Sequence, residues 1–141
     1  MSCSGRYRLL AHTADIGLEV TAASAEELFV IAARGLRSML FGVTEAEPAI
    51  RLEVRLEGEG WAELLVTWLN EILCLCEMRR LVPADFAILE LTEHRLVASV
   101  GGEPYDELRH SVERTAKAVT YHQLVVEARD GGWYARVYID L

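Results

Sequence analysis

Cysteine is scarce in this sequence of 141 residues, and an odd count of three does not suggest a disulfide framework. Cys74 and Cys76 lie in an apolar, helix-like run. Residues two apart point to different faces of a helix, so this pair makes a poor metal chelate. We predict that both are small, buried hydrophobic side chains.

Long apolar runs are also missing. No run reaches the roughly 18 residues that a membrane helix needs. The N-terminal stretch MSCSGRYRLL lacks the apolar segment of a secretory signal. We therefore expect a cytoplasmic protein with no membrane partner.

Basic residues are fewer than acidic ones. Lys and Arg number 14 against 22 Asp and Glu, which gives a formal net charge of −8. Nucleic-acid affinity depends on basic side chains that neutralise phosphates, so we expect no direct nucleic-acid binding. The acidity suits a cationic partner, either a metal ion or a basic protein surface, or it only keeps the chain soluble.

Familiar catalytic motifs are absent as well. The sequence has no Ser-His-acid arrangement, no glycine-rich phosphate loop and no paired-cysteine zinc motif. The stretch VGGEP, which starts at Val100, is too short to cradle a phosphate and predicts a turn. No linker, repeat or low-complexity tract divides the chain, so we expect a single domain over residues 1–141.

Two segments have the apolar spacing of helices, residues 24–42 and 61–81. The first opens with Ser24 and Glu27, whose spacing allows a capping box. Gly42 follows as a typical helix-ending residue. These features predict two main helices, both in the first part of the chain.

Most of the remaining chain predicts strands. Residues 7–22 give a strand, a break at His-Thr-Ala-Asp and another strand, whereas residues 103–114 are either irregular or a short helix. The other predicted strands are residues 49–58, 86–93, 95–102, 117–128 and 133–141. The fold class is therefore α+β: a mostly antiparallel or mixed β-sheet with two main helices packed on one face.

One candidate for chemistry lies at the end of the sequence. If Leu141 is the native end of the chain, its terminal carboxylate lies beside the Asp140 side chain. Adjacent carboxylates repel each other unless one binds a proton or a cation sits between them. Such oxygen ligands suit Ca²⁺, Mg²⁺ or Mn²⁺. The alternative is a solvated, frayed chain end.

A second candidate is the break in the first strand pair. Asp15 is either a turn residue that bonds its own backbone or a ligand, and His12 is either a satisfied histidine at a strand end or a functional group. Lys117 and His122 lie in a later strand, where a lysine is usually solvated. The residues by themselves predict a small α+β domain with a candidate hard-metal site and assign no function.

Several blocks of the sequence resemble the archease family, and they occur in family order. They are HTADIGLEV, SAEELFVIAARGL, LLVTWLNEIL, KAVTYHQLVV and the final WYARVYIDL, which together extend over nearly the whole chain. The resemblance implies an archease-like fold and an accessory protein that is not an enzyme. Its partner would be the GTP-dependent tRNA-splicing ligase of the RtcB type, whose guanylylation and multiple turnover it would promote.

The resemblance also implies roles for individual residues. The metal ligands that it matches, for a divalent ion such as Ca²⁺, Mn²⁺ or Mg²⁺, are Asp15, Asp140 and the main-chain oxygen of Leu141. The residues that it matches to ligase activation are Lys117, His12 and His122. The chain departs from the family at Ala11, where an acidic residue usually precedes the histidine.

Two other functions stay open at this point. The first is an autonomous metal-dependent phosphoesterase, with Asp15 and Asp140 as ligands and His12 or His122 as the base. Two carboxylates and a chain end are few ligands for a two-metal site, which weighs against it. The second is a chaperone-like module that binds exposed protein segments, although the sequence suggests no large Met-rich surface.

Overall fold

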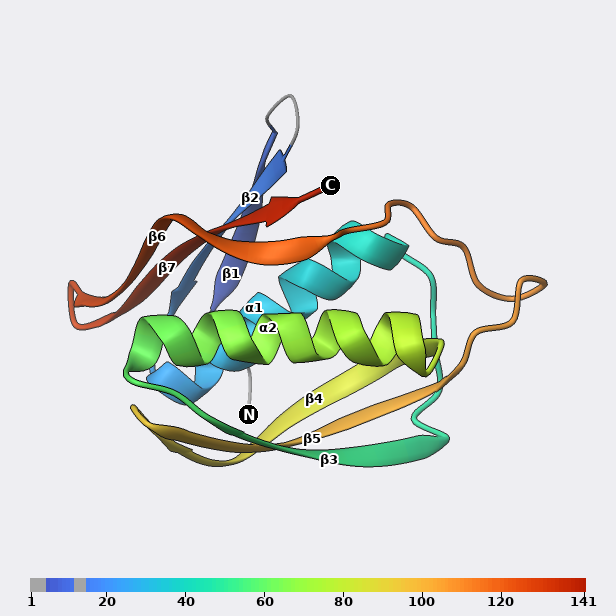
Figure 1. Cartoon of the computed structure of the whole chain (residues 1–141), viewed down its shortest axis with the longest axis horizontal. Helices are drawn as coiled ribbons and strands as arrows, with labels where there is room; N and C mark the ends of the chain where they lie inside the picture. The colour runs from blue at the N-terminus through green and yellow to red at the C-terminus, as the bar shows by residue number, and fades with distance from the viewer. Residues whose placement is uncertain (1–4, 12–14) are drawn as a thin grey trace.

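The computed structural model describes residues 5–11 and 15–141, which form three layers (Figure 1). A four-stranded sheet and a three-stranded sheet form the outer layers, and the helices lie between them. The elements in chain order are β1 (Arg6–Ala11), β2 (Asp15–Ala22), α1 (Ala25–Phe41), β3 (Ile50–Glu57), α2 (Trp61–Met78), β4 (Leu81–Thr92), β5 (Arg95–Pro104), β6 (Ala118–Arg129) and β7 (Gly132–Asp140). No helix within these described ranges is long and apolar enough to cross a membrane.

The strands pair antiparallel in both sheets, in the orders β1-β2-β7-β6 and β3-β5-β4. The α+β class is therefore confirmed, but the strands divide between two sheets where the sequence pattern suggested one. The reason lies in the helices. Each helix contacts strands of both sheets, so the broad apolar stripe in its sequence is buried on two sides and not on one.

The predicted helix start is confirmed at α1. Ser24 Oγ accepts a hydrogen bond from the Glu27 backbone N–H at 3.1 Å, and Glu27 Oε1 accepts one from the Ala23 N–H at 3.0 Å. These bonds satisfy backbone donors that the first turn leaves free. Gly42 ends the helix at a φ of 59°, a left-handed value that costs glycine little.

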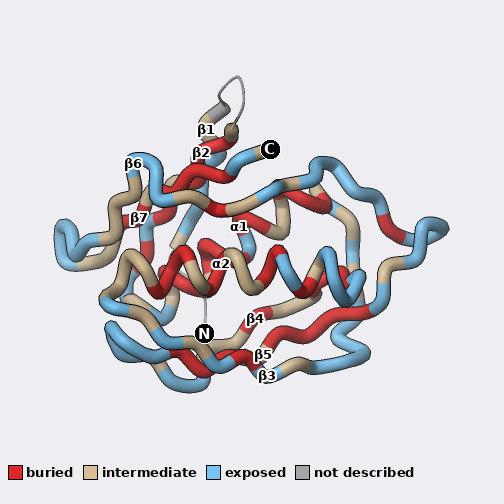
Figure 2. Tube along the Cα trace, in the orientation of Figure 1, coloured by how far each residue is buried: buried red, intermediate tan, exposed pale blue. Residues whose placement is uncertain are grey.

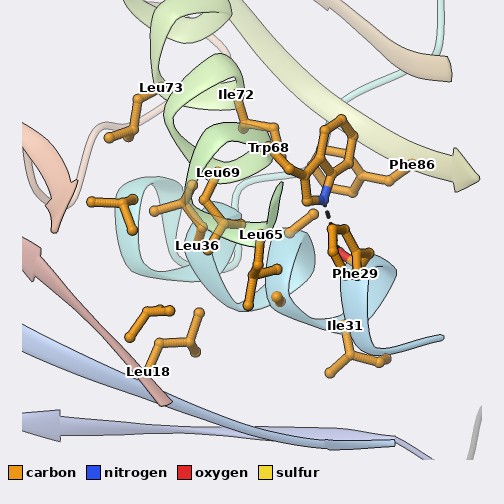
Figure 3. Close-up of a cluster of buried hydrophobic side chains, with 14 of the residues drawn as sticks. Leu18, Phe29, Ile31, Leu36, Leu65, Trp68, Leu69, Ile72, Leu73 and Phe86 are labelled. Carbon is orange, nitrogen blue, oxygen red and sulfur yellow. Dashed lines mark hydrogen bonds between the residues drawn. The ribbon is translucent and has the colours of Figure 1, made fainter. Parts of the chain in front are cut away.

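The core fills the space between the helices and each sheet, and Figure 2 shows buried residues gathered along the helices and the strands that pack on them. Trp68 is one of its largest fully buried side chains. Its indole N–H donates to the Phe29 carbonyl oxygen at 3.0 Å, and its ring meets Phe86 edge-on with centroids 6.1 Å apart (Figure 3). One buried side chain of α2 thus links α1 to the three-stranded sheet.

Two local predictions are wrong. Cys74 is exposed, because only part of the apolar run in α2 faces the core, whereas Cys76 is partly buried and packs against the core. The turn expected from Val100 is instead a continuation of β5. A side chain at Gly102 would place its Cβ 2.5 Å from the Val82 carbonyl oxygen, so glycine there lets β4 approach closely.

Residues 105–117 form neither helix nor strand, and a buried polar network holds this segment to β5. Glu103 Oε1 lies 2.6 Å from His110 Nε2 and 2.9 Å from the Arg109 guanidinium. Its other oxygen accepts from the Glu47 backbone N–H at 3.1 Å. His110 Nδ1 accepts from the Asp106 N–H at 2.9 Å, so the proton of the neutral ring lies on Nε2, which donates to Glu103.

This network controls the charge of Glu103. Burial by itself would raise the pKa of the carboxyl group. The hydrogen bonds from His110 and the Glu47 backbone, together with the charge of Arg109, outweigh burial and hold the pKa below its ordinary value. A lowered pKa means that the folded state binds this proton less readily than the unfolded chain does. The resulting stabilisation is present above the ordinary glutamate pKa and is lost as the pH falls through the lower, folded value.

We therefore expect Glu103→Gln to remove an acid-sensitive part of the stability. At neutral pH the variant should unfold at a lower temperature than the wild type, and the two unfolding temperatures should converge as the pH falls below the ordinary glutamate range. Thermal unfolding followed by circular dichroism at a series of pH values checks this. Glu107→Gln, which changes an exposed carboxylate of the same segment, is the control and should leave the curve unchanged. Parallel curves for the wild type and Glu103→Gln would contradict the assignment.

Candidate functional site at one end of the four-stranded sheet

The pairing of β2 with β7 brings the two ends of the sequence together. In this register Asp15 lies opposite Asp140, and the neighbouring Ile16 and Ile139 are buried in the core. Directly paired residues of antiparallel strands point to the same face, with Cβ atoms about 4.5–5.5 Å apart. The two carboxylates therefore share the outer face of the sheet. Like charges in this position repel each other, so a cation bound between them would be stabilised.

The start of β6 adds Lys117 to the same end of the sheet. Ala118 pairs with Asp140, and the Lys117 backbone N–H donates to the Asp140 carbonyl oxygen at 2.8 Å. Lys117 is exposed, and it is the only lysine of the sequence. Leu141 follows Asp140 and packs half-buried against the core. Asp15, Asp140, Leu141 and Lys117 therefore lie next to one another at this end of the sheet.

Asn70 of α2 fixes the strand that carries Lys117. Its amide nitrogen donates to the Val119 carbonyl oxygen at 3.0 Å, and its amide oxygen accepts from the Val119 N–H at 2.9 Å. β6 is an edge strand of its sheet. The side-chain amide therefore takes the place that a further strand would fill, and it ties the first residues of β6 to the helix layer.

His122 lies further along β6 and is exposed. Its ring stands edge-on to Tyr138 of β7, with ring centroids 5.8 Å apart. Gly17 lies opposite Tyr138 in the β2–β7 register, and a Cβ at Gly17 would come 3.0 Å from the phenol ring. Because Gly17 has no side chain, the Tyr138 ring has space to lie over it on the outer face. The β6–β7 register is interrupted between Thr120 and Val125, the part of β6 that contains His122.

Glu19 is another acidic group on this face, and two side chains bind it. Tyr134 donates its hydroxyl to Glu19 Oε2 at 2.7 Å, and Arg8 forms an ion pair with the same carboxylate. The hydrogen bond from Tyr134 and the charge of Arg8 lower the pKa of Glu19, although burial opposes them. Burial, followed by that hydrogen bond, raises the pKa of Tyr134. Glu19 therefore stays a carboxylate held by the Tyr134 hydroxyl and the Arg8 guanidinium.

The donor set at the Asp15–Asp140 end fits a hard cation only in part. Within residues 5–11 and 15–141, no three His, Cys, Asp or Glu side chains form a group that could hold a metal ion. Two carboxylates with a main-chain oxygen of Leu141 match the oxygen preference of Ca²⁺, Mg²⁺ or Mn²⁺. His12 lies outside the described residues. A metal bound here would need water or a partner's atoms to complete its coordination.

Comparison with known proteins shows which family the chain belongs to. The model of the archease protein family matches residues 7–141. The chain is 37% identical over 135 residues to the protein archease of Methanopyrus kandleri, covering 94% of this chain and 96% of that one. It is 37% identical over 140 residues to the protein archease of Thermococcus gammatolerans, covering 96% and 99%. This chain belongs to the archease family.

The fold of this archease-family chain also matches a solved structure. The solution structure of Methanobacterium thermoautotrophicum protein 1598 is similar with a TM-score of 0.73 and 27% identity, covering 96% of this chain and 98% of that one. Archease-family proteins are known as activators of tRNA-splicing ligases. Membership therefore places the chain among accessory proteins and not among enzymes.

Two residues of the candidate site could not be predicted from the sequence. Tyr138 shares a face with Asp140 by strand alternation, but a tyrosine in a strand gives no signal of function by itself. Asn70 stands in a helix, and its two hydrogen bonds to Val119 reach a strand almost 50 positions away. Only the tertiary fold brings such groups together.

A surface pocket of about 470 Å³ begins one residue before Lys117. The residues that line it are Leu40, Phe41, Leu73, Cys76, Glu77, Arg80, Leu81, Tyr105, Val112, Arg114, Thr115 and Ala116. Most of this lining is apolar, and burial raises the pKa of the Cys76 thiol to about 12. The thiol is therefore protonated. It contributes apolar surface to the pocket and does not serve as a nucleophile or metal ligand.

Proposed function

We propose that this chain activates a GTP-dependent tRNA-splicing ligase of the RtcB type in the cytoplasm, by promoting guanylylation of the ligase and its multiple turnover. The observation that supports the proposal is the register that sets Asp15 opposite Asp140, with Lys117 hydrogen-bonded through its backbone to Asp140. Two carboxylates and one lysine at the edge of an acidic protein make a surface suited to a nucleotide-handling site on a partner.

The chemistry of guanylylation fits these groups. Transfer of a nucleotidyl group to a histidine builds negative charge on phosphate oxygens, and divalent ions and cationic side chains stabilise such charge. Asp15, Asp140 and the Leu141 main-chain oxygen would hold the ion. Lys117 reaches into solvent beside them and would contact a phosphate or an acidic group of the ligase.

The test is guanylylation of the purified ligase with and without this chain, at limiting ligase and with labelled GTP. We expect the chain to speed formation of the ligase–GMP adduct and to raise the number of ligations per ligase. Unchanged guanylylation would overturn the proposal. Phosphodiester hydrolysis by this chain alone would favour a phosphoesterase instead.

Lys117 offers a sharper prediction. Replacing it by alanine should weaken ligase activation at least about tenfold, the effect of losing one hydrogen bond to a charged group. Metal affinity should stay unchanged, because the lysine side chain carries no ligand atom for a cation. Guanylylation rates and calorimetric titration with Mn²⁺ check the two halves. Lys117→Arg, which keeps the charge, should retain part of the activation, and joint loss of metal binding and activation in Lys117→Ala would contradict this role.

A further inference from the structure

β3 is a free and regular sheet edge. In the part of the chain that the structure describes, it pairs with β5 alone, over eight residues without a register shift. Figure 1 shows it along the margin of the three-stranded sheet. An edge of this length presents a row of backbone N–H and C=O groups that another strand can pair with.

The other described edges are each protected. β4 has Pro83 and two register shifts along its length. β6 is bulged near Gln123, which has a φ of 49°, and its Val119 backbone is occupied by Asn70. β1 has six residues, and both of its charged side chains are arginines, so self-pairing would gain no opposite charge. Protection of these three edges leaves β3 as the one fit to receive a strand.

The sequence of β3 is complementary to itself in the antiparallel direction. Its outward side chains alternate in sign as Arg51, Glu53, Arg55 and Glu57. If two copies align with Val54 opposite Val54, each Arg51 faces a Glu57 and each Glu53 faces an Arg55. Opposite charges directly across an antiparallel pair stabilise it, and this register contains no like-charge pair.

The inner face is complementary in the same register. Leu52 of one copy would lie opposite Leu56 of the other, and both side chains are half-buried at the margin of the core in the single chain. Ile50 is 42% exposed on the same face. Pairing would therefore cover apolar surface that the single chain leaves open at this edge.

We propose that the chain forms a homodimer by antiparallel pairing of β3 with β3 of a second copy, centred on Val54. The two three-stranded sheets then join into one continuous sheet with the helices of both copies on the same side. The Asp15–Asp140 end lies on the outer face of the other sheet, so it stays accessible in each copy (Figure 1). The dimer is independent of the proposed ligase activation.

The first test is the mass in solution, by light scattering and sedimentation equilibrium over a range of concentrations. We expect the wild type to reach twice the chain mass of 15.8 kDa. Glu53→Arg should raise the dissociation constant at least about tenfold, because two attractive pairs become repulsive. Arg55→Glu should do the same. A wild type that stays at the single-chain mass would overturn the proposal.

A mixing experiment identifies the register. Glu53 and Arg55 already form an ion pair within one chain, at 2.7 Å, so each single reversal also disturbs its own strand. Mixing the Glu53→Arg variant with the Arg55→Glu variant, however, restores opposite charges only between different chains. We expect the mixture to form heterodimers as tightly as the wild type dimerises. Failure of the mixture to associate would overturn the register.

The matched control is Glu127→Arg. Glu127 and Arg129 form a similar ion pair at 2.7 Å two residues apart, but on the protected edge strand β6. This variant should dimerise like the wild type. Circular dichroism confirms that each variant is folded. A dimer that Glu127→Arg weakens as much as Glu53→Arg does would show that β3 is not the interface.

Discussion

Replacing Asp140 by asparagine should lower ligase activation at least about tenfold. Removing a group that supports a bound metal typically lowers metal affinity or activity by about 10- to 100-fold, and we expect at least the lower value. The same change should leave the protein at least as stable as before in the absence of metal. The reason is the register: Asp140 lies opposite Asp15, and asparagine relieves the repulsion between two like charges while keeping the size of the side chain. Asp15→Asn should lower ligase activation to a similar extent.

Thermal unfolding with increasing Mn²⁺, Mg²⁺ or Ca²⁺ separates this prediction from a merely structural effect. A ligand that binds only the folded state stabilises it by about 2.7 kcal/mol at 100 times its dissociation constant. The unfolding temperature of the wild type should therefore rise as metal is added, whereas that of neither variant should change. Asp130→Asn, in the turn at the far end of the β6–β7 hairpin, is the matched control and should respond like the wild type. An Asp140→Asn protein that still responds to metal and still activates the ligase would rule out this site.

Much of the fold could be predicted because its signals are local. The Ser24–Glu27 cap, the glycine at position 42 and the alternation in β3 depend on neighbouring residues, and the structure confirms each of them. The division into two sheets could not be predicted. A helix that is apolar on two sides and one that is apolar on a single broad side have similar sequences, and only the contacts of α1 and α2 with both sheets distinguish them.

The candidate site was predictable in part for a different reason. The carboxylates were visible in the sequence, but their meeting depends on the pairing of β2 with β7, which joins positions 125 residues apart. The structure brings Asp15, Asp140 and Lys117 to one end of the sheet, as the resemblance implied. The turn predicted from Val100 is wrong because glycine occurs both in turns and where two strands approach closely, and the two cases look alike in a sequence.

Trp68→Ala should cause the largest loss of stability, about 3–5 kcal/mol. Trp68 is fully buried in α2, donates to the Phe29 carbonyl of α1 and packs edge-on against Phe86 of β4 (Figure 3). Removing it leaves a cavity where three elements meet, and the surrounding helices and strands cannot all move inward together. Because domains are stable by only about 5–15 kcal/mol, a large part of the total is lost.

Chemical denaturation with urea measures this loss, and two further variants show its origin. Trp68→Phe keeps most of the apolar volume but removes the N–H donor; its cost should be smaller, because the Phe29 carbonyl lies within α1 and has a helical partner of its own. Trp61→Ala removes an equally large side chain that is only half-buried at the start of α2. It should cost clearly less than Trp68→Ala, since water can enter the space that it leaves. Equal losses from Trp61→Ala and Trp68→Ala would mean that stability follows the size of the removed ring and not its position between the layers.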